Sequence, residues 1–445
     1  MQKDKIVVIG AGLAGAEAAW QAAKLGVRVE LHEMKPQKFS PAHSNNGFAE
    51  LVCSNSLRSN QLDNAVGLLK EEMRRMGSLI MEAAYATQVP AGSALAVNRD
   101  EFSRYITDKI KGNPLIEVVE GEVCEISSEA ITVVATGPLT SEAMANRISE
   151  ITGGDELHFF DAAAPIIDFS TVNMDKAFFA SRYGKGNPED YLNCPMTEDE
   201  YRAFYNELVG AQTAPLKAFD RELQEELTVF EGCMPVEVMA SRGYDTLRFG
   251  PMKPVGLPLP STGEDAFATV QLRRENKEGT MYNIVGFQTH LTFGEQKRVF
   301  RMIPGLENAE FFRYGVMHRN TYINSPGKLT SIYSMREYEN LFFAGQMTGV
   351  EGYVESASSG FVAGINAARL ALGKAPIVFP RETEIGALAA YISEGGVSSH
   401  FQPMNANFGI IAPLDKKVKG GKKARNEIYS QRSLEIIDQY FLSFD

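Results

Sequence analysis

The sequence predicts an α/β fold in which a Rossmann-like domain is interrupted by an inserted α+β domain. An apolar strand at 6–9 runs into a glycine turn, and residues 16–25 continue with helical composition. Two further apolar strands end in glycine turns far along the chain, at 131–137 and 340–346. The long block between them has a different texture, with aromatic, proline-rich and polar helical segments, which indicates an insertion.

The length of the chain supports this division. Its 445 residues, of which 44% are hydrophobic, suffice for two compact domains with separate cores. We therefore expect a first part of a nucleotide-binding domain at 1–140, an inserted substrate domain at 141–324, and a second part of the first domain at 325–445.

Bulk composition limits the classes of function. No stretch approaches the roughly 18 apolar residues of a membrane span, and no basic leader precedes the first strand, so we expect a cytoplasmic protein without a membrane partner. The four cysteines are far apart and form no CxxC pair, which argues against a zinc site, a disulfide framework and a dithiol reductase. We expect no metal. The net charge of -12 opposes a polyanionic partner unless a basic patch gathers locally.

The glycine turn has the context of a dinucleotide-binding motif. Gly10 suits the tight turn, Gly12 the close approach of pyrophosphate, and Gly15 the packing of helix on strand. A second strand at 27–32 ends in Glu33, where a carboxylate would accept hydrogen bonds from a ribose. The expected nucleotide contacts of this motif are Gly10, Ala11, Gly12, Leu13, Ala14, Gly15 and Glu33.

The two later strands favour FAD over NAD, because similar strand ends close around the dinucleotide in two-domain flavoproteins of the glutathione-reductase type. They add Gly137, Gly345 and Gln346 to the expected cofactor contacts. A small-residue helix expected from about 358 to 372 would point its N-terminus at the flavin or the pyrophosphate. A close contact between helix and sheet is the alternative explanation of these glycines.

The chain also resembles a known family along nearly its whole length. The matching segments include FAELVCSNSLRSN at 48, VPAGSALAVNRDEF at 89, FEGCMPVEVMA at 230, LRFGPMKPVGL at 247 and FAGQMTGVEGYVESASSGFVAG at 343. These strings are typical of the FAD- and NAD(P)H-dependent methylenetetrahydrofolate-tRNA-(uracil-5-)-methyltransferases, the TrmFO family.

The resemblance implies an enzyme that makes 5-methyluridine in the T-loop of tRNA, at tRNA position 54. It implies methylenetetrahydrofolate as carbon donor and FAD recharged by NAD(P)H as reductant, with NADH and NADPH both open. It implies no obligatory protein partner. Ribosomal RNA as substrate, and the sister flavoprotein that modifies the wobble uridine, remain alternatives. A non-enzymatic RNA-binding flavoprotein is a third.

Such chemistry needs a thiolate, because addition to carbon 6 of uracil makes carbon 5 nucleophilic. By resemblance Cys53 and Cys233 belong to the active site. We expect Cys233 to be the nucleophile, because it lies in the inserted domain, which could close over an extruded base, but the sequence leaves the roles of the two cysteines open. Cys53 would remove the carbon 5 proton or guard the flavin-bound methylene. Cys124 and Cys194 are interpreted as small buried apolar residues. Arg58 and Arg242 follow the two active-site cysteines in sequence, and their proximity in space is open.

Three further sets of residues are candidates for binding. Tyr353, among glycines, is a candidate for stacking on the flavin or the pterin, or else a plain core tyrosine. His290 and His318-Arg319 are either ligand contacts or ordinary histidines. The RNA-binding candidates in the basic C-terminal segment are Lys416, Lys417, Lys419, Lys422, Lys423 and Arg425. A solvated lysine-rich turn is the alternative explanation of this segment. The basic pairs at 273–274 and 297–298, with Arg301, could extend the RNA-binding surface.

Overall fold

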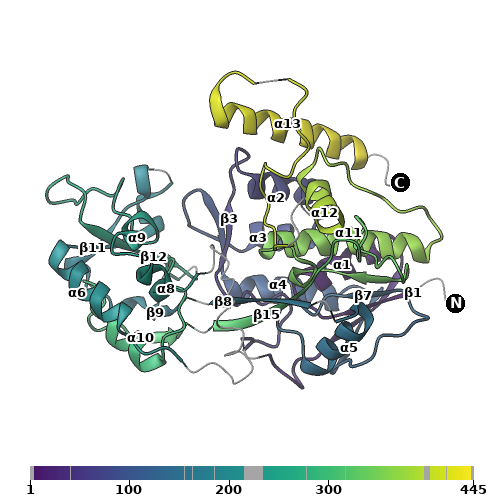
Figure 1. Cartoon of the computed structure of the whole chain (residues 1–445), viewed down its shortest axis with the longest axis horizontal. Coiled ribbons are helices and arrows are strands. Elements are labelled where there is room, and N and C mark those ends of the chain that lie inside the picture. Colours follow the sequence, from purple (N-terminus) through teal and green to yellow (C-terminus); the bar gives the residue numbers. More distant parts are fainter. Residues whose placement is uncertain are drawn as a thin grey trace.

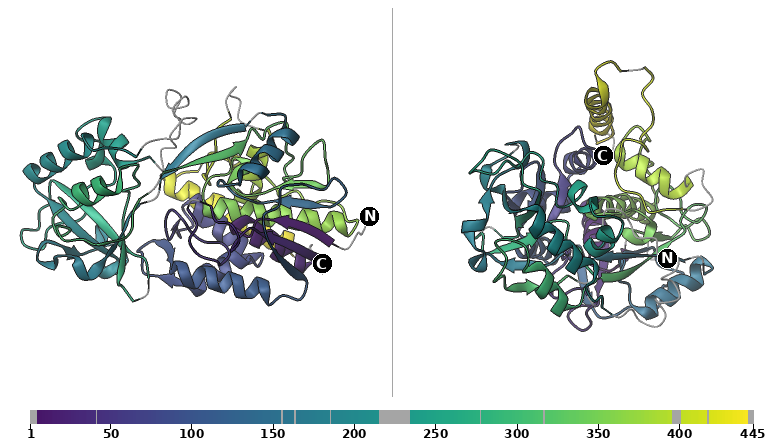
Figure 2. Two further views of the ribbon diagram at one scale, coloured as in Figure 1. Left: turned by 90° about the horizontal axis from the view of Figure 1, so that it is seen from below. Right: turned by 60° about the vertical axis from the view of Figure 1, so that its left-hand side comes forward.

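The computed structural model has two lobes (Figure 1). It describes residues 5–40, 42–154, 156–162, 164–184, 186–214, 234–276, 278–315, 317–394, 401–416 and 418–441. The larger lobe contains both chain ends and a parallel sheet, and the smaller lobe is built from the middle of the chain (Figures 1 and 2). No helix in the described part has the length and apolar character needed to cross a membrane.

A five-stranded parallel sheet forms the centre of the larger lobe. Its order is β16-β7-β1-β2-β6, with β1 Lys5–Ile9, β2 Arg28–Glu33, β6 Ile116–Glu120, β7 Thr132–Val134 and β16 Leu341–Phe343. The strands expected at 6–9, 27–32, 131–137 and 340–346 are all present and adjacent, although the last two are shorter than the expected ranges. The α/β class predicted from the sequence is confirmed.

Helices from both ends of the chain pack on this sheet and on one another. They are α1 Leu13–Lys24, α2 Ala65–Arg75, α3 Leu79–Ala86, α4 Arg99–Lys111, α5 Glu142–Thr152, α11 Tyr353–Ala371, α12 Glu384–Glu394 and α13 Gly421–Phe441. A small sheet with the order β3-β5-β4 lies beside them, formed by β3 Ser56–Ser59, β4 Gln88–Val89 and β5 Ala94–Val97. In Figure 1, α13 lies at the top of the larger lobe.

Helix α11 begins earlier than the sequence indicated. It starts at Tyr353 and not near 358, because Gly352, with φ of 110°, turns the chain directly into the first helical residue. Its glycines face helix α1: a Cβ at Gly360 would meet the Ala14 carbonyl oxygen at 2.1 Å, and one at Gly364 would meet Ala18 Cα at 2.5 Å. The close contact is therefore between two helices, and both ends of the chain share one core.

The smaller lobe is built on a six-stranded antiparallel sheet in the order β10-β11-β12-β13-β9-β14. Its strands are β9 Ile166–Asp168, β10 Phe178–Phe179, β11 Tyr191–Met196, β12 Ala268–Arg274, β13 Met281–Ile284 and β14 Phe311–Arg313. Helices α6 Glu198–Val209, α8 Val236–Ser241, α9 Thr246–Phe249 and α10 Phe293–Phe300 complete it. Its apolar core runs from Ile167 to Ala309 and is separate from that of the larger lobe.

Two long antiparallel strands, β8 Glu156–Ala162 and β15 Met317–Ile323, connect the lobes. Before them, α5 buries Met144 and Ile148 in the core of the larger lobe. The helix that the sequence assigned to the inserted block therefore packs with the nucleotide-binding domain. The exact borders at 140/141 and 324/325 stay predictions.

Candidate active site

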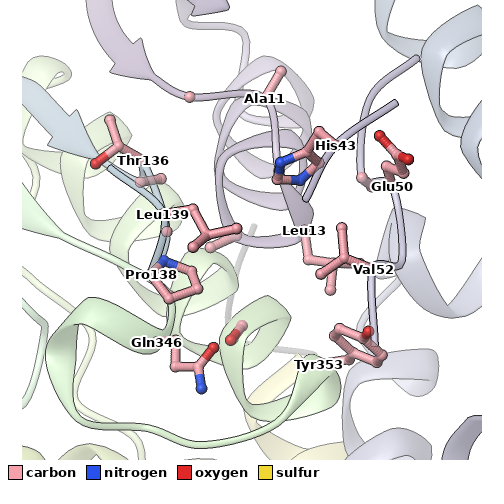
Figure 3. Close-up of a pocket in the computed structure, with 18 of the residues that line it drawn as sticks. Ala11, Leu13, His43, Glu50, Val52, Thr136, Pro138, Leu139, Gln346 and Tyr353 are labelled. Atoms are coloured by element: carbon pink, nitrogen blue, oxygen red, sulfur yellow. The ribbon is translucent and has the colours of Figure 1, made fainter. Parts of the chain in front are cut away.

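A cavity of about 560 Å³ lies where the parallel strands end. It is lined by residues at the ends of β1, β2, β7 and β16 or just after them, such as Gly10, Glu33, Thr136 and Gly345. Figure 3 shows Thr136, Pro138 and Leu139 on one side and His43, Glu50 and Val52 on the other. The carboxyl ends of the strands, near the point where the strand order changes direction, are the position at which open α/β sheets bind ligands.

The three glycines of the first turn are required for different geometric reasons. Gly10 has φ of +98°, and a Cβ there would lie 2.6 Å from the Ala135 carbonyl oxygen. A Cβ at Gly15 would lie 1.7 Å from the carbonyl oxygen of Gly10, so this glycine is needed for packing and does not line the cavity. A Cβ at Gly12 would meet no atom within 4 Å, because it would project into open space at the cavity.

Two helices begin at the cavity wall. Helix α1 follows Gly12 and helix α11 follows Gly352, and neither of these residues supplies a side-chain cap to the first N–H groups. Uncapped N–H groups and the positive end of the helix dipole suit the two phosphates of a dinucleotide. FAD therefore fits this site, because Gly12 leaves open space for the phosphates and the uncapped N–H groups at the starts of α1 and α11 can donate to them.

Glu33 is the last residue of β2 and is 7% exposed. Its Oε2 accepts a hydrogen bond from the Ala11 N–H at 2.9 Å, and its Oε1 accepts one from the Lys35 N–H at 3.0 Å. The carboxylate is thereby held at the cavity wall in a fixed orientation, as a ribose-binding residue requires. Gly137, Gly345 and Gln346 also line the cavity.

The structure brings Cys53 and Tyr353 together at the cavity, although 300 residues separate them. The Tyr353 hydroxyl accepts hydrogen bonds from the N–H groups of Cys53, at 2.7 Å, and of Ser54, at 3.2 Å. Burial raises the pKa of the Tyr353 hydroxyl well above its usual range, so the group stays neutral. Besides lining the cavity, Tyr353 therefore holds the backbone that carries Cys53.

Sequence reasoning missed Arg99 and misplaced Arg273. Arg99 donates to the carbonyl oxygens of Leu51 and Val52, just before Cys53. The arginine suggested by sequence spacing, Arg58, lines the cavity but forms an ion pair with Glu355. Arg273 is buried and donates to Ser54 Oγ at 2.8 Å, so it is not part of an exposed RNA surface. No local motif marks these arginines, because their partners come from distant segments.

The other cysteines fall into three situations. Cys194 is fully buried in the smaller lobe, and burial raises its pKa to about 12, which agrees with an inert apolar role. Cys124 is exposed, so the expectation that it is buried was wrong; it lies in the irregular segment between β6 and β7. Cys233 lies outside the described residues. Shortly after it, the Val236 N–H donates to the carbonyl oxygen of Gln288, a residue that lines the cavity.

The histidine candidate His290 has ordinary contacts. Its N–H donates to Glu237 Oε1 at 2.7 Å, and burial lowers the pKa of its ring. His290 does not line the cavity described above. The backbone of His318 lies in β15 opposite Asp161, in the pair of strands that connects the lobes.

The basic C-terminal segment is exposed at the start of α13. Among the described residues, no carboxylate forms an ion pair with its cationic members Lys416, Lys419, Lys422, Lys423 and Arg425, while Lys417 lies outside the described residues. In contrast, Lys297, Arg298 and Arg301 of the smaller lobe pair with Glu310, Glu207 or Glu295. The C-terminal segment is therefore the better candidate for an anion-binding surface.

Comparison with known proteins agrees with this geometry. Residues 5–375 match the family described as Glucose inhibited division protein A, GIDA. A protein of Acetivibrio thermocellus named methylenetetrahydrofolate-tRNA-(uracil-5-)-methyltransferase TrmFO is 61% identical over 98% of both chains. One of the same name from Enterococcus faecalis is 58% identical over 99% of both.

Among solved structures, GidA of Aquifex aeolicus superimposes with a TM-score of 0.70 at 17% identity, covering 98% of this chain and 73% of that one. This likeness supports the fold alone. The resemblance inferred from the sequence strings is confirmed, and the chain belongs to the GIDA family and, within it, to the methylenetetrahydrofolate-tRNA-(uracil-5-)-methyltransferases of the TrmFO type.

Proposed function

We propose that this protein methylates carbon 5 of a uridine in tRNA, with methylenetetrahydrofolate as the carbon donor. The observation that carries the proposal is the full-length identity of 58–61% to proteins named for this reaction. The cavity supports it, because a dinucleotide-binding turn and a cysteine meet on its wall. We further propose the T-loop uridine at tRNA position 54 as the target.

FAD fits the cavity. The first glycine turn and the N-terminus of α1 would hold the pyrophosphate of FAD, and Glu33 would bind its ribose. Gly137, Gly345 and Gln346 would contact the rest of the cofactor. When bound and reduced by NAD(P)H, the flavin supplies the reducing equivalents that convert a methylene into a methyl group. The chain itself binds and orients the reactants and moves the protons.

The two cysteines are assigned to the uracil ring. The Cys233 thiolate adds to carbon 6, and the electron pair of the 5,6 double bond moves toward the carbonyl, which makes carbon 5 nucleophilic. After carbon 5 has accepted the one-carbon unit, a base removes the carbon 5 proton and the bond between that unit and its carrier breaks, which leaves an exocyclic methylene on the ring. A hydride equivalent, which the reduced flavin would supply, converts this methylene into the methyl group, and departure of the Cys233 thiolate from carbon 6 then restores the double bond. Cys53, on the cavity wall, is our candidate for that base or for a guard of the one-carbon unit.

The RNA has to reach this cavity. The exposed cations at the start of α13 would contact phosphates and position the tRNA without reading its bases. Helix α13 is anchored on the loop at 60–64, since Asn426 Nδ2 donates to the Asp63 carbonyl oxygen at 2.9 Å. That loop directly follows β3, which lines the cavity. The target uridine would leave its stack to enter.

The test is an incubation of purified protein with unmodified tRNA transcript, methylenetetrahydrofolate and NADPH, followed by nucleoside mass spectrometry. We expect 5-methyluridine only when folate is present, and none from Cys233→Ala or Cys53→Ala. Cys124→Ala is the matched control and should keep full activity, because Cys124 is exposed and does not line the cavity. Methylation of ribosomal RNA and not of tRNA would mean that ribosomal RNA is the substrate. Methylation of neither RNA would overturn the proposal.

A further inference from the structure

The Cys53 loop, residues 51–55, is hydrogen-bonded to the end of a strand from the other lobe. At the end of β12, Arg273 donates to Ser54 Oγ at 2.8 Å and to Asn55 Oδ1 at 3.1 Å. The next residue, Arg274, accepts a hydrogen bond at its carbonyl oxygen from Asn55 Nδ2 at 3.0 Å. Two successive residues of the smaller lobe thus contact the loop of the larger lobe directly.

The residue after these, Glu275, reaches the same loop through an arginine. Glu275 is 2% exposed and accepts two hydrogen bonds from Arg99, at 2.7 Å from Nε and 3.3 Å from an Nη. The other Nη of Arg99 donates to the carbonyl oxygens of Leu51, at 2.8 Å, and Val52, at 3.4 Å. One planar guanidinium therefore bridges a carboxylate of the smaller lobe and the backbone just before Cys53.

The loop is also bonded to helix α11 of the larger lobe. Tyr353, at the first turn of α11, accepts from the N–H groups of Cys53 and Ser54. The carbonyl groups before Cys53 thus bond to Arg99, whereas the N–H groups at Cys53 and Ser54 bond to Tyr353. A shift of Glu275 would be transmitted through Arg99 to a backbone that is fixed at its other end.

We propose that the Arg99–Glu275 pair is a positioning device that makes the location of the Cys53 thiol depend on the placement of the smaller lobe. Arg99 does not line the cavity and acts through the loop, so it is a positioning residue. Its effect on methylation rests on the proposed function, whereas its effect on the loop does not. The device would let the thiol reach its working position only when the smaller lobe is seated against the loop.

The loop can be observed without any methylation assay. In the intact protein, hydrogen exchange of the peptide containing residues 51–55, and alkylation of Cys53 by iodoacetamide, both report on its placement. We expect about tenfold faster exchange in Glu275→Gln and in Arg99→Gln, the change produced when a charge-assisted hydrogen bond is removed. The alkylation rate of Cys53 should change in the same two variants.

Glu310→Gln is the matched control, because it removes another carboxylate of the smaller lobe that pairs with an arginine, Arg301, away from the Cys53 loop. It should leave both rates unchanged. Arg99→Lys tests geometry against charge: it keeps the charge but cannot span carboxylate and carbonyls in one plane, so we expect exchange close to that of Arg99→Gln. Circular dichroism melting verifies that each variant is folded.

Methylation kinetics supply the second readout. A displaced thiol should lower kcat on the order of 10- to 100-fold with little change in KM for tRNA. The double variant Arg99→Gln/Glu275→Gln should be no slower than Arg99→Gln alone, because the two residues act as one unit. Unchanged loop exchange in Glu275→Gln, or additive reductions in the double variant, would overturn the inference. If the wild-type protein methylates nothing while the loop responds, the proposed function fails and the positioning device stands.

Discussion

The hydroxyl of Tyr353 is the acceptor for two backbone N–H groups at Cys53 and Ser54. Loss of the hydroxyl would remove both of these hydrogen bonds at a partly buried site. Its role as a stacking residue for the flavin or the pterin stays a prediction, but the contact with the Cys53 loop constrains it: the hydroxyl end of the ring is fixed by the backbone.

Tyr353→Phe should therefore destabilise the protein by about 1–3 kcal/mol, since it removes the acceptor of two backbone hydrogen bonds, and should lower the rate of methylation. Urea unfolding and nucleoside mass spectrometry measure the two effects. Tyr391→Phe is the control, since its hydroxyl bonds one exposed carbonyl, that of Gln402. Equal reductions in the two variants would show that the bonding of Tyr353 to the Cys53 loop has no special importance.

At the scale of elements, the contact between α1 and α11 couples the first glycine turn to the second half of the nucleotide-binding domain. Because a Cβ at Gly360 would lie 2.1 Å from the Ala14 carbonyl oxygen, the two helix axes can approach only with glycine there. Both helices begin at the cavity, so their separation sets the spacing of the N–H groups that face it.

We expect Gly360→Ala to cost about 1–3 kcal/mol, as overpacking of a core does, and to weaken FAD retention. Thermal melting and the flavin absorbance of the purified protein measure these changes. Gly294→Ala in α10 is matched, because a Cβ there meets no atom within 4 Å. It should be neutral or slightly stabilising. A Gly360→Ala protein as stable and as yellow as wild type would contradict the close approach of the helices.

A buried carboxyl on α2 connects that helix to α12 and α13. Glu72 of α2 accepts hydrogen bonds from the N–H groups of Glu384, at 2.8 Å, and Ile385, at 2.9 Å, at the start of α12, and from the Ser433 hydroxyl of α13. Burial raises the pKa of Glu72 to about 7, against the hydrogen bonds that favour its charged form. The folded state thus holds this proton more tightly than the unfolded state.

The sign of the pH effect follows from that shift. The stabilisation by Glu72 is complete below the ordinary value of 4.5 and is lost as the pH rises through about 7. We expect the unfolding free energy of the wild type, relative to that of Glu72→Gln, to fall on the order of 3 kcal/mol between those pH values. Urea titrations across this range measure it. A difference that is constant with pH would mean that the carboxyl is ionised throughout.

For the whole molecule, the proposed function requires that a protein with a net charge of -12 bind a polyanion. The cations of α13 that face solvent without carboxylate partners in the described part of the chain offer the local solution. Their helix is fixed to α2 by the ion pair of Arg75 with Asp438, at 2.6 Å, and by the Ser433 hydrogen bond, so the charge is presented on a rigid support.

The double variant Lys422→Glu/Lys423→Glu should weaken tRNA binding and reduce the slope of log affinity against log salt by about 1 for each phosphate that the protein no longer neutralises. Filter binding at several salt concentrations measures both. Arg104→Glu/Lys374→Glu changes the net charge equally at exposed sites elsewhere and should have a smaller effect. Equal weakening by the two double variants would mean that net charge alone, and not this segment, governs binding.

Local signals in the sequence predicted the parts of the site that are close together along the chain. The glycine turn and Glu33 could be placed because strand, turn, helix and strand follow one another within about 30 residues. The contacts of the Cys53 loop with Tyr353, Arg99 and Arg273 could not be predicted, because they depend on how α11, α4 and β12 are arranged. The sequence places Arg273 on a surface for the same reason, since its partner Ser54 comes from a distant segment. The start of α11 is predicted too late for a local reason, namely that Gly352 is not recognised as the residue before the helix.

In the proposed reaction, the carbon of the new methyl group comes from folate and reaches a tRNA uridine at this site. Supplying methylenetetrahydrofolate deuterated at the methylene carbon, together with unlabelled S-adenosylmethionine, tests it most directly. We expect 5-methyluridine that carries both deuterium atoms at the T-loop position, and none from Cys233→Ala. Unlabelled 5-methyluridine, or labelled product undiminished in that variant, would contradict it.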